Sequence, residues 1–328
     1  MKLTALNASV ALLVLTSAAA RAATEERIQK RFAVQPGGTV AVDVEFGAIA
    51  VSTNATSEVV VEAWRKIGRS KKADEEAYLR EHPVTFSQEG STVTIRCQGE
   101  NKRSWWSRGK QQNEATYTLT VPAKFNAQLK TGGGGIEVVD LTGEVRAATG
   151  GGELSFARLH GPLDGNTGGG GVEAEDCHGP LKLRTGGGSL EVSGSSGSLD
   201  GKTGGGSVSV KGFQGPAHVS SGGGGVTIEK VSGAVDASTG GGSITAVLPG
   251  QLSDTVKLST GGGGINLSVA GDAAFNLDAK TGGGRVTTEL PVTVVGKMEG
   301  GRLEGPVNGG GKSVQLRCGS GAIRLKKL

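Results

Sequence analysis

Hydrophobic and polar residues follow one short pattern along most of the chain. From Thr131 onward the sequence falls into blocks of 18 residues, each opened by a hydroxyl residue and a run of glycines, as in TGGGGIEVVDLTGEVRAA and TGGGELSFARLHGPLDGN. Six such blocks follow one another, and the spacing then lengthens to 21. A fixed period of this length is typical of a repeat protein. The opening residues are Thr131, Thr149, Thr167, Thr185, Thr203, Ser221, Thr239, Thr260 and Thr281, and a degenerate copy opens at Asn308.

Each block contains two stretches in which apolar and polar residues alternate. In the first block, Ile136 and Val138 are the apolar pair of one stretch, and Val145 and Ala147 are the pair of the other. This alternation predicts two β-strands per block, separated by glycine-rich corners. One block cannot bury its apolar face alone, but stacked copies can. We therefore expect an all-β fold in which residues 129–328 form a parallel β-solenoid of about 18-residue rungs, with two sheets and a thin core.

Two polar columns should follow from this stacking. The opening hydroxyl residue is placed so that its side chain turns inward at a corner, where it should hydrogen-bond to its equivalents or to the backbone. One outward position of the second strand carries charges that mostly alternate in sign from block to block, so stacking in register would place opposite charges side by side. These charged residues are Arg146, Asp164, Lys182, Asp200, His218 and Asp236.

Residues 23–128 lack the 18-residue period. Strand-like runs such as VAVDVEFGAIAV and EVVVEAW precede a polar stretch that predicts a short helix near residues 71–81, with Ser70 as its N-cap. We interpret this part as a β-rich module that starts and caps the solenoid, because the end of a sheet needs protection. At the other end of the chain, the charged strand Ile323–Lys327 is expected to protect the last edge.

The first 22 residues have the features of a signal peptide. Lys2 gives a positive start, residues 8–20 are almost wholly apolar or small, and Ala20-Arg21-Ala22 fits a cleavage site after Ala22. The apolar run is too short to span a bilayer as a stable helix. We therefore expect an exported protein, located in the periplasm or at the cell surface, without a transmembrane segment in the mature chain. Cleavage removes two cations and lowers the formal charge from +4 to +2, a balance that disfavours a nucleic-acid partner.

The chain is poor in residues that often build catalytic sites. Glycine accounts for 59 of 328 residues, and there are only four His and three Cys. Cys97 and Cys318 both end strand-like runs and are a possible disulfide pair, since an exported protein can keep one. Cys177 takes a core position of its block and is interpreted as a small buried hydrophobe.

Two histidines recur at the same position of neighbouring blocks, each in the string His-Gly-Pro. Stacking would place His160 and His178 one rung apart, near enough to share a metal ion, but two imidazoles alone make a poor site. We expect exposed corner residues and no cofactor. The acids Asp164 and Asp200 have Lys182 between them, which suits ion pairing better than the carboxyl pair of a glycosidase. No nucleophile-elbow string supports a Ser-His-Asp triad.

The strongest binding candidate lies outside the repeat, in the polar string KRSWWSRGK. Trp105 and Trp106 are flanked there by Arg103 and Arg108, and a second basic run, WRKIGRSKK, covers residues 64–72. Exposed Trp beside cations suits an anionic envelope glycan, a lipid headgroup or a protein partner. The alternative interpretation is that one Trp packs over the solenoid end while the cations are simply solvated.

A strand pair with an inserted helix, then the string TYTLTVPAKFNAQLKTGGGGIEV, then the glycine-rich blocks resemble the putative-adhesin family of bacterial envelope proteins, a domain of unknown function with β-strand repeats. The resemblance covers residues 32–328. It implies a β-solenoid and export, and it carries over no catalytic residue. We therefore expect a non-enzymatic cell-envelope or surface protein that displays a binding surface. A carbohydrate-active enzyme on a β-helix and a purely structural assembly module are the alternatives.

Overall fold

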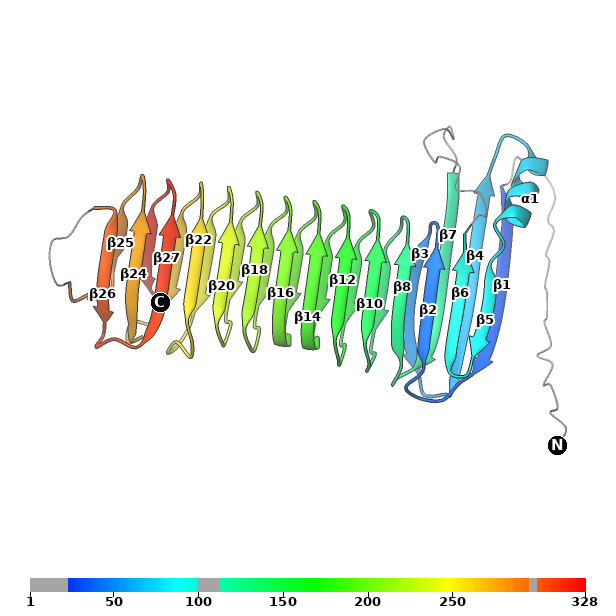
Figure 1. Cartoon of the computed structure of the whole chain (residues 1–328), viewed down its shortest axis with the longest axis horizontal. Helices are drawn as coiled ribbons and strands as arrows, with labels where there is room; N and C mark the ends of the chain where they lie inside the picture. The colour runs from blue at the N-terminus through cyan, green and yellow to red at the C-terminus, as the bar shows by residue number, and fades with distance from the viewer. Residues whose placement is uncertain (1–22, 99–111, 295–299) are drawn as a thin grey trace.

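The computed structural model describes residues 23–98, 112–294 and 300–328. They form a long rod of two 14-stranded sheets that face each other, with one short helix at the N-terminal end (Figure 1). Along the repeat, each strand pairs in parallel with the equivalent strand of the next rung. The predicted parallel β-solenoid, with a helix in its N-terminal part, is confirmed. No helix among the described residues has the length and apolar character needed to cross a membrane.

The two sheets are named by the order of their strands in space. In order, sheet A consists of β1 (Thr24–Ala33), β4 (Glu58–Gly68), β7 (Gln112–Pro122), β3 (Ala48–Asn54), β9 (Ile136–Val139), β11 (Leu154–Ala157), β13 (Val172–Glu175), β15 (Leu190–Ser193), β17 (Val208–Lys211), β19 (Val226–Glu229), β21 (Ile244–Leu248), β23 (Ile265–Val269), β28 (Ile323–Lys327) and β25 (Val286–Thr288). In the same direction along the rod, sheet B consists of β5 (Thr85–Glu89), β6 (Thr92–Cys97), β2 (Thr39–Val44), β8 (Asn126–Thr131), β10 (Val145–Thr149), β12 (Leu163–Thr167), β14 (His178–Thr185), β16 (Ser196–Thr203), β18 (Ala217–Ser221), β20 (Val235–Thr239), β22 (Val256–Thr260), β27 (Lys312–Cys318), β24 (Phe275–Thr281) and β26 (Arg302–Val307).

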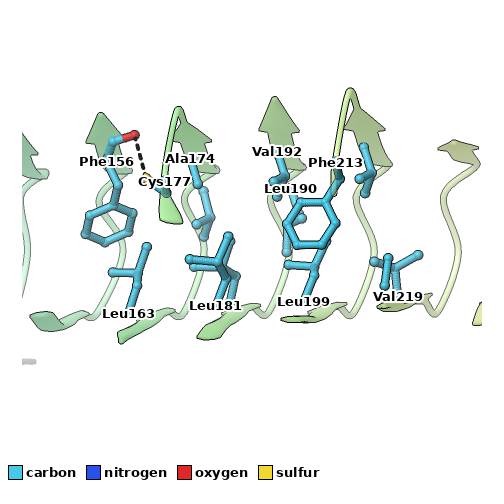
Figure 2. Close-up of a cluster of buried hydrophobic side chains, with 14 of the residues drawn as sticks. Phe156, Leu163, Ala174, Cys177, Leu181, Leu190, Val192, Leu199, Phe213 and Val219 are labelled. Atoms are coloured by element: carbon cyan, nitrogen blue, oxygen red, sulfur yellow. Dashed lines mark hydrogen bonds between the residues drawn. The ribbon is translucent and has the colours of Figure 1, made fainter. Parts of the chain in front are cut away.

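The core is a thin apolar layer between the sheets. In sheet B, Leu163 lies beside Val145 on one side and Leu181 on the other, and all three are almost fully buried. Figure 2 shows such side chains from both sheets meeting in the middle of the rod. Large residues in one sheet pack against small residues in the other. The Phe156 ring packs against Gly165, where an added Cβ would lie 3.0 Å from the ring. Volumes are thus matched across the layer, as close packing requires.

The opening hydroxyl of each rung joins two rungs at the corner. Thr149 Oγ1 donates to the Gly134 carbonyl of the preceding rung at 2.8 Å and accepts the Gly152 N–H of its own rung at 3.3 Å. This confirms that the hydroxyls point inward and bond to the backbone, although they do not bond to each other. The same two bonds recur at Thr167, Thr185, Thr203, Ser221, Thr239 and Thr260.

Two of the three glycines after each opening residue are required by the closeness of the next rung. A Cβ on Gly188 would lie 2.0 Å from the Gly170 carbonyl oxygen, and one on Gly186 would lie 2.3 Å from the equivalent oxygen of Gly168. The middle residue, Gly187, has its nearest neighbour at 3.8 Å. Side chains are therefore excluded at the first and third positions of the run and tolerated at the second.

We expect Gly188→Ala to destabilise the rod, by roughly 1–3 kcal/mol, because the new methyl group overlaps backbone that cannot move without breaking the rung register. Gly187→Ala, one residue away in the same run, should change the free energy of unfolding by less than about 0.5 kcal/mol. Urea unfolding of the two variants measures the difference. Equal stabilities would show that the corners are looser than this stacking implies.

The last coil of the chain is inserted between two earlier coils. β27 lies between β22 and β24, and β28 lies between β23 and β25. The expectation that Ile323–Lys327 protects the final edge is therefore wrong, because this strand has a partner on both sides. The degenerate copy is not at Asn308 either. The last rung opens at Cys318, whose Sγ donates to the Gly263 carbonyl at 2.9 Å and accepts the Gly321 N–H at 3.1 Å, as a threonine hydroxyl would.

The three cysteines are all buried and unpaired. Nine strands of sheet B separate Cys97 in β6 from Cys318 in β27. At about 4.8 Å per strand, this separation is far beyond the ~7 Å between Cα atoms that a disulfide can span. The expected Cys97–Cys318 pair is therefore wrong. Cys177 is a fully buried core residue as expected, and burial raises the pKa of its thiol to about 11.

Helix α1 (Lys72–Glu81) is the short helix that the sequence predicts. Its N-cap is Lys71, and no side-chain capping bond is formed, so the expectation that Ser70 caps the helix is wrong. Glu75 instead fixes the segment that precedes the helix, because its carboxylate accepts a hydrogen bond from the Arg69 N–H at 2.9 Å. The same buried carboxylate also accepts the N–H and hydroxyl of Thr24, at 3.0 and 2.7 Å, and so fastens α1 to β1.

Glu75 should make the stability of this end of the rod depend on pH. Burial raises the pKa of Glu75, but the donors of Arg69 and Thr24 more than offset this and hold the pKa below its usual value. The carboxylate therefore stabilises the fold above its unfolded-state pKa, and this contribution is lost as the pH falls through the lowered folded-state pKa. We expect Glu75→Gln to be less stable than wild type at neutral pH and the difference to shrink at about pH 3. Thermal unfolding at both pH values measures it, and a pH-independent difference would contradict the assignment.

Candidate functional site

The predicted Trp site lies outside the described residues. Trp105, Trp106, Arg103 and Arg108 belong to the segment 99–111, so their role in binding stays a prediction. Two other regions gather polar side chains from several rungs. One is the corner that carries the two predicted histidines, and the other is the outward face of sheet B.

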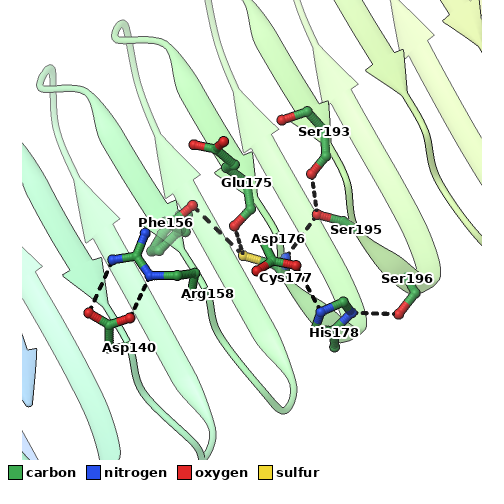
Figure 3. A network of polar contacts seen from close by, with 10 residues as sticks. All are labelled: Asp140, Phe156, Arg158, Glu175, Asp176, Cys177, His178, Ser193, Ser195 and Ser196. Atoms are coloured by element: carbon green, nitrogen blue, oxygen red, sulfur yellow. Dashed lines mark hydrogen bonds and ion pairs between the residues drawn. The ribbon is translucent and has the colours of Figure 1, made fainter.

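The histidine corner contains an arrangement that resembles a catalytic triad (Figure 3). His178 Nδ1 lies 2.7 Å from Ser196 Oγ, and His178 Nε2 lies 3.0 Å from Asp176 Oδ1. Asp176 sits in the left-handed region, with φ of 52°, at the turn before β14. Sequence reasoning missed this grouping, although Ser196 follows His178 by one period of 18 and is therefore its neighbour on the next rung.

The corner lacks the donors that acyl-transfer chemistry needs. An oxyanion hole requires backbone N–H groups that are free to meet the developing charge. Here the Ser196 N–H donates to the Cys177 carbonyl at 2.9 Å, and the Gly197 N–H donates to Gln214 at 2.9 Å. The side chains of His178 and Asp176 are 37% and 52% exposed, so water is not excluded. The arrangement is best explained as a hydrogen-bonded corner.

The two histidines are neighbours, as stacking predicts, but they do not face a common point. The ring centroids of His160 and His178 are 4.9 Å apart, at an interplanar angle of 50°. Both nitrogens of His178 already have partners in Ser196 and Asp176. Among the described residues, no group of three or more His, Cys, Asp or Glu side chains is placed to hold a metal ion. The geometry therefore favours the interpretation as corner residues.

We expect Ser196 not to react with a fluorophosphonate probe, since no free donors are placed to stabilise the adduct oxyanion. Mass spectrometry of the treated protein tests this directly. The Ser196→Ala variant is the control, and it should show the same background as wild type. A phosphonylated Ser196 peptide would show instead that the corner is a working hydrolase site.

The charged column of sheet B is in register, but only part of it forms ion pairs. Lys182 Nζ lies 3.3 Å from Asp164, and His218 Nδ1 lies 3.5 Å from Asp236. Elsewhere the charges find other partners. The Arg146 guanidinium turns to Glu144 at 2.6 Å, and Asp200 is held by Arg184 and Lys202 at 3.1 and 3.4 Å. Most charges of this column in the middle of the rod therefore have an oppositely charged partner, but the partner is not always the stacked residue of the next rung.

Near the N-terminal end, the same face contains a shallow hollow of about 490 Å³ over β6, β2, β8, β10 and β12. The outward residues Ala41 and Ala148 are small and leave this space. Around it stand Arg96, Lys130 and Gln128, whose side chains make no hydrogen bond or ion pair to any other described residue. Asp43, Arg146, Asp164 and Asn166 complete the polar rim. The hollow thus presents unused donors on a face whose other charges are largely paired.

The opposite face of the rod carries outward acids on some of the neighbouring rungs. Glu137, Glu173 and Glu191 point outward from β9, β13 and β15 of sheet A, and all three are exposed. Glu173 and Glu191 are adjacent in register. At these rungs sheet A therefore presents carboxylates, whereas the hollow on sheet B is bordered by the cations Arg96, Lys130 and Arg146 as well as by Asp43 and Asp164.

The two long parallel sheets joined by tight corners show that the protein is a two-sheet β-solenoid with regular rungs. The family model for the toastrack domain, DUF4097, matches residues 42–326, and the chain belongs to this family. The predicted family membership is thereby confirmed. None of the curated proteins matches the chain.

Several solved structures resemble the chain at low sequence identity. A putative adhesin from Parabacteroides merdae has 11% identity and a TM-score of 0.38, over 92% of this chain and 96% of its own. A putative adhesin from Bacteroides fragilis has 11% identity and a TM-score of 0.30, over 92% and 97%. A putative lipid binding protein from Parabacteroides distasonis has 12% identity and a TM-score of 0.38, over 91% and 96%.

Proposed function

We propose that this protein is a non-enzymatic, exported surface protein whose rod displays the sheet B hollow to an anionic envelope glycan. The observation that carries the proposal is the cluster of donors around the hollow, Arg96, Lys130 and Gln128, which lack partners within the described chain. Guanidinium and ammonium groups bind carboxylate or phosphate, and the amide can bind hydroxyls. Such a mixture suits a charged sugar polymer.

The shape of the hollow supports a polymer over a small ligand. Small-molecule sites are usually deep, mostly apolar clefts that bury nearly the whole ligand. Here the hollow is shallow, polar side chains stand around its rim, and it crosses five neighbouring strands of one sheet. A chain lying across the rungs could therefore contact several of them at once, and many weak contacts would add up.

The remaining parts of the proposal come from the sequence. Export rests on the signal-peptide features of residues 1–22 and on the family resemblance. Trp105 and Trp106 follow β6 in the sequence, and β6 supplies Arg96 to the hollow. We propose that the Trp segment adds to glycan binding. The alternative of a carbohydrate-active enzyme is weakened because Asp164 and Asp200, the carboxylates considered for glycosidic cleavage, are both in ion pairs. The alternative of a purely structural module offers no role for the donors around the hollow.

The double variant Arg96→Ala with Lys130→Ala should bind an anionic polysaccharide at least about tenfold more weakly, since it removes two charge-assisted contacts. Alginate is the probe, and neutral dextran is the negative polymer control. Lys257→Ala is the matched variant, because Lys257 is an exposed cation on the same face but far along the rod. It should bind alginate like wild type.

Three outcomes would count against the proposal. Equal retention of all variants on alginate would remove the hollow as the site. Binding to vesicles of anionic lipid but not to alginate would point to a lipid headgroup. Turnover of alginate into shorter chains would restore the enzyme alternative.

A further inference from the structure

No strand among the described residues pairs with the outer edge of β1, at the N-terminal end of the rod. It is the terminal strand of sheet A, it has 10 residues, and it contains neither Pro nor Gly (Figure 1). The other terminal strands are shorter: β5 has 5 residues, β25 has 3, and β26 has 6 and includes Pro306. An open edge of this length is a template for pairing with another strand.

The pairing of β1 with β4 shows which backbone groups face outward. The Val34 N–H donates to the Ser57 carbonyl at 3.0 Å, in line with the antiparallel register of the two strands. Bonded pairs alternate along an antiparallel ladder, so the even-numbered residues of β1 bond to β4 and the odd-numbered residues point away. The Ala33 carbonyl agrees with this, because it accepts a bond at 2.7 Å from the Gln88 side chain outside β4. The outward backbone groups are those of Glu25, Arg27, Gln29, Arg31 and Ala33.

The charges of β1 are self-complementary in one antiparallel register. If a twofold axis passes through Ile28, Glu25 lies opposite the partner's Arg31, and Glu26 lies opposite the partner's Lys30. Because of the symmetry, each pair occurs twice. A shift of the axis by one residue in either direction opposes arginines instead, Arg27 with the partner's Arg27 or Arg27 with the partner's Arg31. Opposite charges across strands stabilise pairing, and like charges oppose it.

We propose that two copies of this chain join end to end through antiparallel pairing of their β1 strands, with the twofold axis at Ile28. Sheet A then continues from one rod into the other. The outward odd-numbered residues meet one another in this register, as backbone bonding requires. Ile28, which is half-buried at the end of the core, packs against the partner's Ile28. Besides its ladder and side-chain contacts with β4, β1 is hydrogen-bonded to other elements of its own chain near its two ends, at Thr24 and Ala33.

The register of the proposed dimer can be tested through one ion pair between the two copies. Glu26 is already bound by the buried Arg65 of its own chain, so its share in the interface is limited. Glu25 and Arg31 are more available, since their own-chain contacts are long: Arg27 and Trp64 lie 3.9 and 3.4 Å from the Glu25 carboxylate, and Glu58 lies 3.7 Å from Arg31. Both side chains are well exposed. The pair between Glu25 and the partner's Arg31 is therefore the one to reverse.

Light scattering coupled to size exclusion should find wild type as a dimer at micromolar concentration. Arg31→Glu should weaken the dimer at least about tenfold, because it creates two like-charge contacts across the axis. The swap Glu25→Arg with Arg31→Glu should restore it. This rescue separates the interface from effects within one chain, since the swap restores opposite charges only between the two copies.

Two further variants test the backbone and the register. Gln29→Pro removes an outward N–H that β4 does not use, so it should abolish the dimer while circular dichroism stays unchanged. Ile28→Cys should form a disulfide-linked dimer under mild oxidation, whereas Thr24→Cys, at the same inward side of the strand, should not. A monomeric wild type would overturn the proposal. A dimer that survives both Arg31→Glu and Gln29→Pro would also overturn it, because the copies would then meet through another surface.

Discussion

The distance between stacked corners is the constraint on which the rest of the structure depends. Rungs approach so closely at the glycine runs that a single methyl group on Gly188 would overlap the backbone of the rung before it. The opening hydroxyl, as at Thr149, then bonds to both rungs at once. A slip of one residue would break both bonds and turn every strand side chain to the other face. Since the corners hold the register, a core only one layer thick is sufficient.

The repeating part of the fold was predictable because its two periods are visible in the sequence. Alternation indicates strands, and the spacing of 18 indicates which residues stack. The ends were not predictable to the same degree. A rung can stack on either face of another, so the order along the chain does not determine the order in space, and the final coil lies between two earlier ones. The last rung, CGSGAIRL, does not stand out in the sequence as a repeat, because Cys318 takes the place of the opening hydroxyl residue.

The candidate sites differ in the same way. The contact between His160 and His178 follows from the period alone, and Ser196 could have been found by the same spacing. The hollow on sheet B had no comparable signal. It depends on small outward residues at Ala41 and Ala148, which are far apart in the sequence. They come near each other only because β2 lies beside β8 in sheet B, and β8 lies beside β10.

A rod of this kind can change its outward residues without changing its fold. Each outward side chain contacts mainly the same position on two neighbouring rungs, and the backbone beneath is held by the corners and the core. Exposed ion pairs such as Lys182 with Asp164 add little stability, on the order of 0–1 kcal/mol. Arg96 and Lys130, which have no ion-pair partner within the part of the chain that the structure describes, therefore cost the fold little, and fold stability does not account for them. They gather around one hollow on sheet B, and this arrangement is the basis on which we propose the hollow as a binding surface.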